Sequence, residues 1–110
     1  MAPSPNELLQ GTVDLLILKA ASLQPMHGWG ISQRIQQITR GALEVNQGAL
    51  YPSLHRLEDQ GWLDAEWGTS DNNRRAKFYR ITAAGRRQLT VERQSWERYA
   101  RAVQLLLRAV

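Results

Sequence analysis

The fold is decided by the stretch Asn46-Gln47-Gly48-Ala49-Leu50-Tyr51-Pro52-Ser53-Leu54-His55-Arg56-Leu57-Glu58-Asp59-Gln60-Gly61. Within it, Leu50, Leu54 and Leu57 recur at the i, i+4, i+7 spacing that puts apolar side chains on one face of a helix. Asn46 is a favourable N-cap, and Gly61 is a favourable residue just beyond a helix C-terminus. The pattern therefore predicts a helix between Asn46 and Gly61.

The face opposite the leucines is small at its N-terminal end and then becomes aromatic and basic. A helix that enters a DNA groove with its N-terminal end needs small residues there, followed by side chains that reach base edges and phosphates. An ordinary amphipathic core helix would show the same leucine stripe, so the stretch alone leaves both interpretations open. The side chains that we expect to contact DNA from this helix are Gln47, Tyr51, Ser53, His55 and Arg56.

Pro52 is the unusual residue of the predicted helix. If the helix starts after Asn46, Pro52 lies in the second turn, where it removes one backbone hydrogen bond and bends the helix. If the helix starts near Ala49, Pro52 lies in the first turn, where proline is tolerated. The sequence leaves both starts open.

Length and composition bound the class of protein. The 110 residues fit one domain, and a hydrophobic fraction of 43% is ordinary for a globular protein. Without cysteine there is no disulfide framework, thiol nucleophile or cysteine-based metal site. Residues 1–6 lack the pattern of a signal peptide, and no apolar run approaches the ~20 residues of a membrane span. We therefore expect a cytoplasmic protein without membrane contact.

Catalysis and metal binding find little support in the sequence. The two histidines, His27 and His55, lie on different predicted elements without an evident nucleophile. The chain has no phosphate-binding glycine loop and no paired-carboxylate motif. No second ligand stands at metal spacing from His27, so we expect a local structural role for it. We therefore predict no enzyme, no metal and no cofactor.

The formal net charge of +4 is unevenly distributed. Residues 1–61 carry four basic and five acidic side chains, whereas residues 62–110 carry ten basic and five acidic ones. A localised basic segment is typical of a protein with a polyanionic partner. A solvated basic surface would show the same charge. The excess begins with Arg74, Arg75, Lys77 and Arg80.

Two more helices are predicted before the deciding stretch. Residues 7–23 are apolar at helical spacing on more than one side, which is typical of a buried central helix. Residues 28–39 carry a stripe of Ile31, Ile35 and Ile38, and Gly41 closes that helix. The polar residues of this helix are expected to face water; they are Ser32, Gln33, Arg34, Gln36 and Gln37. We expect a turn at 26–30, with Trp29 in packing, and an extended link at 42–45 that could form a minimal strand.

A hairpin is predicted directly after the third helix. Residues 62–67 and 76–81 alternate with a two-residue period, and the polar residues 68–75 lie between them. A basic hairpin in this position is typical of a wing. We expect Arg74, Arg75 and Lys77 to contact phosphate or enter a minor groove, although a solvated loop would look similar.

Residues 82–110 are predicted to form one long helix, with Thr82 as its N-cap. Apolar residues recur there in alternating steps of three and four, interrupted by Glu92, along about 40 Å of helix. A chain of this size cannot cover so long a seam, which favours pairing with a second subunit. The predicted seam consists of Leu89, Trp96, Tyr99, Val103, Leu106 and Val110.

Taken together, residues 7–110 resemble the PadR family of bacterial transcriptional regulators. The stretches 11–18, 27–31, 48–58 and 75–85 carry the resemblance, and 48–58 is the most specific of them. Tyrosine is commoner in the family at the position of Trp29, and Ala76 and Phe78 are mild departures. Pro52 belongs to the family's motif.

The resemblance implies a mainly helical α+β fold. It implies a winged helix-turn-helix domain over 7–81 and a single C-terminal dimerisation helix over 82–110, and the proline-rich residues 1–6 before them are expected to form a disordered tail. It further implies a homodimer that binds double-stranded DNA at an operator with two-fold symmetry, usually as a repressor. In some short members, aromatic residues of the last helix line an apolar cavity between subunits that takes flat hydrophobic drugs. Trp96 matches that position, and a tryptophan that only packs the dimer seam is the simpler alternative.

Another class of function fits the same sequence signals. A dimeric winged-helix interaction module that no longer reads DNA would also show the buried first helix and the long apolar seam. A non-specific RNA binder is less favoured, because stacking aromatics do not line up on a basic sheet.

Overall fold

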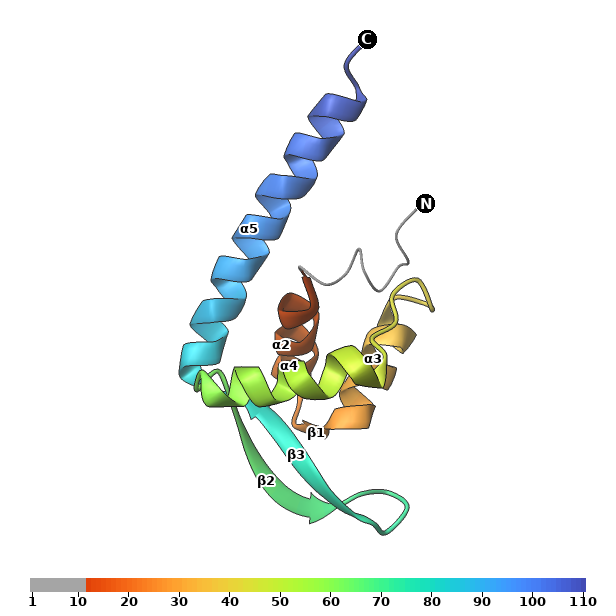
Figure 1. The fold of residues 1–110 in the computed structure, drawn as a ribbon, viewed down its shortest axis with the longest axis vertical. Helices are drawn as coiled ribbons and strands as arrows, with labels where there is room; N and C mark the ends of the chain where they lie inside the picture. The colour runs from red at the N-terminus through yellow and green to blue at the C-terminus, as the bar shows by residue number, and fades with distance from the viewer. Residues whose placement is uncertain (1–11) are drawn as a thin grey trace.

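The computed structural model describes residues 12–110 (Figure 1). The predicted tail over 1–6 and the predicted start of the first helix at Glu7 lie outside the described residues. No helix in the described part is long and apolar enough to cross a bilayer. The elements in chain order are α2 (Val13–Leu23), β1 (Met26–His27), α3 (Gly28–Ile38), α4 (Gln47–Asp59), β2 (Leu63–Thr69), β3 (Arg75–Ile81) and α5 (Ala83–Leu107).

Helix α2 lies at the centre of the core, as its all-round apolar sequence predicts. It contacts α3, α4, α5 and β3. Ile17 and Leu18 are completely buried, and burial of each such side chain contributes about 1.5–3 kcal/mol. In Figure 1 α3 and α4 lie beside α2, the sheet lies below them, and α5 extends upward away from the sheet.

Both ends of α3 have defined caps. The Nδ1 atom of His27 accepts a hydrogen bond from the Gly30 amide at 3.0 Å, and the imidazole meets the Phe78 ring edge-on at 5.6 Å. The predicted local role of His27 is therefore confirmed. At the other end Arg40 and Gly41 both adopt positive φ, and the Gly41 amide donates to the Gln36 carbonyl at 2.8 Å, which closes the helix.

Two predictions about side chains of α3 are wrong. Ser32 was expected to face water, but it is buried and donates a hydrogen bond of 2.7 Å to the Val45 carbonyl. That bond satisfies the hydroxyl and ties the link at 42–45 to α3. Ile38 was expected to complete the apolar stripe, but this last residue of the helix is 63% exposed.

Helix α4 begins and ends where the sequence predicts. The Asn46 side chain accepts a hydrogen bond from the Ala49 amide at 2.9 Å, so the helix starts at Gln47 and Pro52 lies in its second turn. Gly61 has φ of +79°, and its amide donates to the Glu58 carbonyl at 2.9 Å. The predicted leucine stripe, Leu50, Leu54 and Leu57, is completely buried.

The sheet has three strands in the order β1-β3-β2, all antiparallel. The predicted hairpin is present, and its strands continue to Thr69 and from Arg75, so its loop is shorter than expected. Strand β1 is an addition: the sequence predicts only a turn there, yet Met26 pairs with Tyr79. The minimal strand considered at 42–45 does not form.

The start of α5 is tied to the end of α4. The Thr82 hydroxyl accepts a hydrogen bond from the Gly85 amide at 2.9 Å, as predicted for an N-cap, and donates to the Gly61 carbonyl at 2.7 Å. A Cβ atom on Gly85 would lie 2.0 Å from the Trp62 carbonyl oxygen, so only glycine fits there. The long helix predicted to reach residue 110 ends at Leu107.

Candidate nucleic-acid interface

The outer face of α4 carries three of the five side chains of this helix that are predicted to contact DNA. Gln47, Tyr51 and His55 are exposed on it, with Tyr51 at 38%. The prediction that Ser53 contacts DNA is wrong, because Ser53 is only 6% exposed. Three residues after Leu50, it lies beside the leucine stripe and faces the core, so it cannot reach a DNA groove.

Arg56 is engaged within the protomer. Its guanidinium forms a hydrogen-bonded ion pair with Asp14 of α2. The arginine side chain is still half exposed, and an exposed ion pair of this kind contributes only about 0–1 kcal/mol. A phosphate would therefore have to replace Asp14 before Arg56 could contact DNA.

Lys77 connects the wing to α4. Its ammonium donates to the Glu58 carboxylate at 2.8 Å and lies 5.6 Å from the centre of the Tyr79 ring. The hydrogen bond to Glu58 raises the pKa of Lys77 above its ordinary value, so this group stays charged. Burial likewise raises the pKa of the Tyr79 hydroxyl. Lys77 thus holds the wing against the helix, in addition to any contact with phosphate.

The two arginines of the wing are held differently. The Arg75 guanidinium lies over the Trp67 ring, 4.6 Å from its centre, and Trp67 is more than half exposed. Arg74 is exposed in the loop, where its carbonyl accepts hydrogen bonds from the Ser70 amide and hydroxyl. Within residues 12–110 neither arginine forms an ion pair, so both charges are available to a partner.

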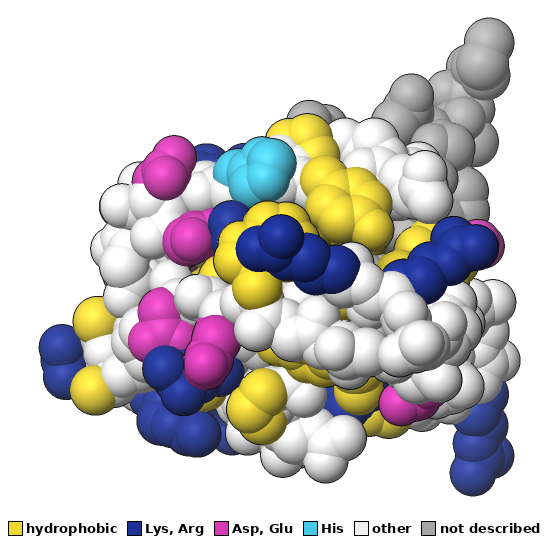
Figure 2. All heavy atoms as spheres, turned by 90° about the horizontal axis from the view of Figure 1, so that it is seen from below, with side chains coloured by type: hydrophobic (Ala, Val, Ile, Leu, Met, Phe, Trp, Pro, Cys, Tyr) yellow, Lys and Arg dark blue, Asp and Glu magenta, His cyan; other side chains and the backbone are white. Residues whose placement is uncertain are grey.

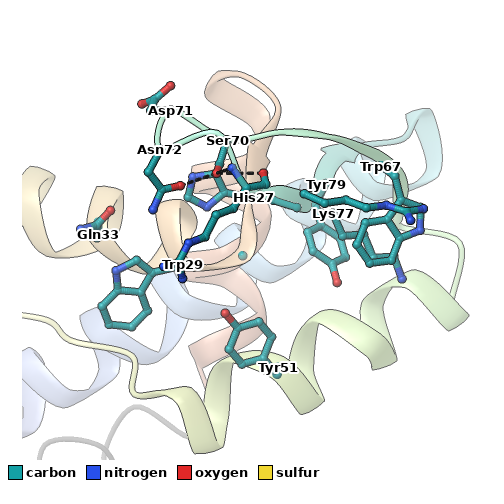
Figure 3. Close-up of a pocket in the computed structure, with 14 residues that line it drawn as sticks. His27, Trp29, Gln33, Tyr51, Trp67, Ser70, Asp71, Asn72, Lys77 and Tyr79 are labelled. Carbon is teal, nitrogen blue, oxygen red and sulfur yellow. Dashed lines mark hydrogen bonds between the residues drawn. The ribbon is translucent and has the colours of Figure 1, made fainter.

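A hollow of about 760 Å³ lies between the wing, the first turn of α3 and α4 (Figure 3). The rings of Trp29 and Tyr51 face it from the two helices, opposite the wing. Trp29 is 44% exposed here, so its expected role in packing is only partly met. Its place in the first turn of α3, beside the wing in space, could not be seen in the sequence. The wing side contributes Trp67, Arg74, Arg75, Lys77, Tyr79 and one acid, Asp71.

Figure 2 shows the molecule from the wing side. Basic side chains cross exposed hydrophobic ones at the centre of this face, and acidic side chains gather toward one edge. The charge count agrees with this mixture of basic and acidic side chains, because residues 1–81 carry eight of each. The net positive charge lies on residues 82–110, with six arginines against two glutamates. The wing is therefore basic locally, on a domain without net charge.

The predicted seam on α5 is exposed over its distal part. Trp96 is 45% exposed and Tyr99 63%, and their rings lie 6.2 Å apart. The prediction that Leu89 belongs to the dimer seam is wrong. Leu89 is 9% exposed and lies in the core of its own chain, because the first turns of α5 pack on α2. Val110 lies beyond the helix. The other exposed apolar side chains of this region are Val103, Leu105, Leu106 and Leu107.

Comparison with known proteins agrees with this architecture. The profile of the PadR-like family of transcriptional regulators matches residues 17–91. A transcriptional regulator of Mycobacterium tuberculosis is 39% identical over 98 residues, which cover 89% of this chain and 88% of that protein.

Solved structures show the same fold. A transcriptional regulator from Clostridium thermocellum superposes with a TM-score of 0.80 at 26% identity, covering 89% of this chain and 95% of that one. A PadR-like transcriptional regulator from Bacillus cereus gives 0.79 at 26% identity, covering 94% and 99%. The fold is thus the winged helix-turn-helix with a long C-terminal helix, and the chain belongs to the PadR-like family of transcriptional regulators.

Proposed function

We propose that the protein is a homodimer that binds double-stranded DNA at a two-fold symmetric operator and acts there as a repressor. One observation carries the proposal most directly: the exposed Tyr51 on α4 borders the same hollow as Arg74 and Arg75 of the wing, which form no ion pair within residues 12–110. A groove-reading helix and a phosphate-binding wing act together in this arrangement.

The side chains divide into two roles. Gln47, Tyr51 and His55 project from α4, which would enter the major groove and meet base edges. Arg74 and Arg75 would contact phosphates, which gives affinity for any sequence and a strong dependence on salt. Arg56 and Lys77 would contribute only after giving up part of their contact with Asp14 and Glu58.

Dimerisation would use the distal half of α5. Its exposed apolar side chains recur in three- and four-residue steps, as in helices that pair by interlocking side chains. Pairing two such helices around a two-fold axis presents two copies of α4. Those copies would meet half-sites about 34–36 Å apart, or multiples of that distance.

A planar hydrophobic effector would bind at the seam between the two α5 helices. Trp96 and Tyr99 form an exposed aromatic pair on the seam. A planar hydrophobic molecule inserted between two such pairs would change the angle between subunits and shift the spacing of the α4 helices. A tryptophan that simply packs the seam is the alternative role for Trp96.

One observation favours a second function, a dimeric interaction module without specific DNA binding. Residues 1–81 carry no net charge, whereas domains that bind DNA usually carry a basic excess. A gel shift on the protein's own promoter region, at physiological salt, separates the two functions. We expect much tighter binding to that DNA than to scrambled DNA of equal length, and equal binding would favour the interaction module.

A further inference from the structure

The net positive charge of the chain lies on the helix that leads away from the wing. Helix α5 and the residues after it hold six arginines and two glutamates, which account for the whole formal charge of +4. Each of these arginines is exposed. In Figure 1 α5 runs from the base of the sheet to the far end of the molecule. The wing and α4 therefore do not share this charge.

The arginines all lie on one side of α5. At ~100° per residue they fall within a sector of about 140°, from Arg93 round to Arg98. Glu97 is the one carboxylate within that sector, while Glu92 lies on another side and hydrogen-bonds to Gln88. None of the arginines has a carboxylate partner within the part of the chain that the structure describes. The six residues, here called the arginine face, are Arg86, Arg87, Arg93, Arg98, Arg101 and Arg108.

The arginine face is turned away from everything else that α5 contacts. Gly85 and Leu89 mark the side that is buried against the protomer core. Trp96 and Val103 continue that same side as the apolar seam, by the same helical count. By that count Arg93 lies about 60° from Trp96 and borders the seam, and a partner helix there would leave the other five arginines open. Intramolecular packing and dimerisation both fail to explain them.

We propose that the arginine face binds a second DNA duplex, distinct from the one held by α4 and the wing. Charge complementarity and length support this partner. Helix α5 is about 37 Å long, and B-DNA of that length presents roughly twenty phosphate charges. Arginine is the side chain best suited to pair with phosphate through two hydrogen bonds. The proposal rests on the proposed function, since one duplex is already bound by the winged domain.

The consequence is a protein that joins two DNA segments. A dimer would carry one operator on its paired α4 helices and an arginine face on each outer side of the α5 pair. The second contact would be independent of sequence and strongly dependent on salt, because it rests on charge alone.

The test uses the full-length protein and two duplexes of unrelated sequence at low salt. One duplex is fixed to beads, the second is labelled, and captured label is measured after the protein is added. We expect the wild type to capture label. The double variant Arg98→Glu/Arg101→Glu should capture at least tenfold less while its binding to the fixed duplex falls less than about threefold. The matched control Lys19→Glu/Arg40→Glu reverses two exposed charges elsewhere and should capture like the wild type.

Capture by the α5 variant at the wild-type level would overturn the proposal, and so would a wild type that binds the fixed duplex without capturing label. Stronger capture of a labelled RNA hairpin than of the duplex would overturn the choice of DNA as partner. Because the arginine face binds any sequence, a wild type that does not bind the fixed duplex at all would overturn both proposals. Loss of all binding to the fixed duplex in the α5 variant would instead show that the winged domain holds no DNA, and the proposed function would then fail separately. Circular dichroism and mass in solution confirm that each variant is folded and of unchanged oligomeric state.

Discussion

The Lys77 ammonium on β3 donates to the Glu58 carboxylate on α4 at 2.8 Å, and this ion pair fastens the wing to the helix beside it. Replacing Lys77 with Met should remove the tether while preserving the stem that covers Tyr79. We expect a loss of stability of about 0.5–1 kcal/mol and a several-fold loss of affinity for specific DNA. Urea unfolding and fluorescence anisotropy measure the two effects. A coupling energy of zero between Lys77→Met and Glu58→Gln in a double-mutant cycle would contradict this role.

The same ion pair predicts a dependence on alkaline pH. The folded-state pKa of Lys77 is raised, mainly by its hydrogen bond to Glu58, above the value of about 10.4 of an unfolded lysine. Its contribution is therefore complete below pH ~10 and is lost as the pH rises through the raised pKa. The stability difference between wild type and Lys77→Met should be constant from about pH 7 to 9 and shrink above roughly pH 10.5. A difference that already changes below pH 9 would contradict the assignment.

Gly85 should be irreplaceable at the junction of wing and α5. A Cβ atom there would lie 2.0 Å from the Trp62 carbonyl oxygen and 2.8 Å from the Ile81 side chain. Gly85→Ala should therefore cost about 3 kcal/mol or more, because backbone must move to accept the methyl group. Gly48→Ala is the control, since its nearest neighbour is Asn46 Oδ1 at 3.4 Å. That change should alter stability by less than about 1 kcal/mol. Equal effects in thermal unfolding would show that the junction tolerates rearrangement.

The wing arginines should contribute equally to the affinity for every DNA sequence. Arg75→Ala removes a charge that lies over Trp67, and we expect weaker binding to specific and random duplexes. The slope of log affinity against log salt should fall by about 0.9 for each lost phosphate contact. Arg80→Ala serves as the control, because Arg80 pairs with Asp64 at 2.6 Å. A salt slope that Arg75→Ala leaves unchanged would remove the wing from the mechanism.

The proposed dimer should depend on the apolar residues of the α5 seam. Val103→Glu places a charge on the seam, and we expect the dimer to dissociate into monomers at micromolar concentration. Val91→Glu is the matched control, since Val91 is 55% exposed but lies outside the seam. Light scattering after size exclusion gives the mass directly. A Val103→Glu variant that keeps the mass of the wild type would place the interface elsewhere.

A planar aromatic compound should quench the fluorescence of Trp96 if the seam takes such a ligand. Because the chain has four tryptophans, the Trp96→Ala variant is an essential control. We expect quenching in the wild type and none in that variant. Quenching that survives in the Trp96→Ala variant would assign the binding to another tryptophan, such as Trp29 beside the wing.

The helices of this protein could be predicted because their signals are long and redundant. The leucine stripe of α4, its Asn46 cap and its Gly61 end agree with one another, and the structure confirms all three. Strand β1 could not be predicted, because a strand of two residues is too short to show an alternation of apolar and polar side chains. It becomes a strand only through pairing with β3, about fifty residues later in the chain. Periodicity therefore gave the long elements and missed the pairing between distant segments.

Errors in single residues have a different origin. Ser53 lies three positions after Leu50, so helical spacing alone could have placed it beside the buried stripe and excluded it from the DNA face. Leu89 follows the seam spacing, but spacing does not show that its own chain already covers it. Trp29 lines the hollow because α3 lies beside the wing in the folded chain, which its sequence position does not show. Only the structure could separate covered from open positions on one helical face.

In the proposed function, two copies of α4 read one symmetric DNA site. Selection of bound duplexes from a random-sequence pool by the full-length protein tests this most directly. We expect enrichment of an inverted repeat whose half-site centres are one or more helical turns of DNA, ~10–10.5 base pairs each, apart. Substitution of Tyr51 or His55 should change the bases enriched within each half. A pool that stays random after several rounds, or a single unrepeated motif, would contradict the claim.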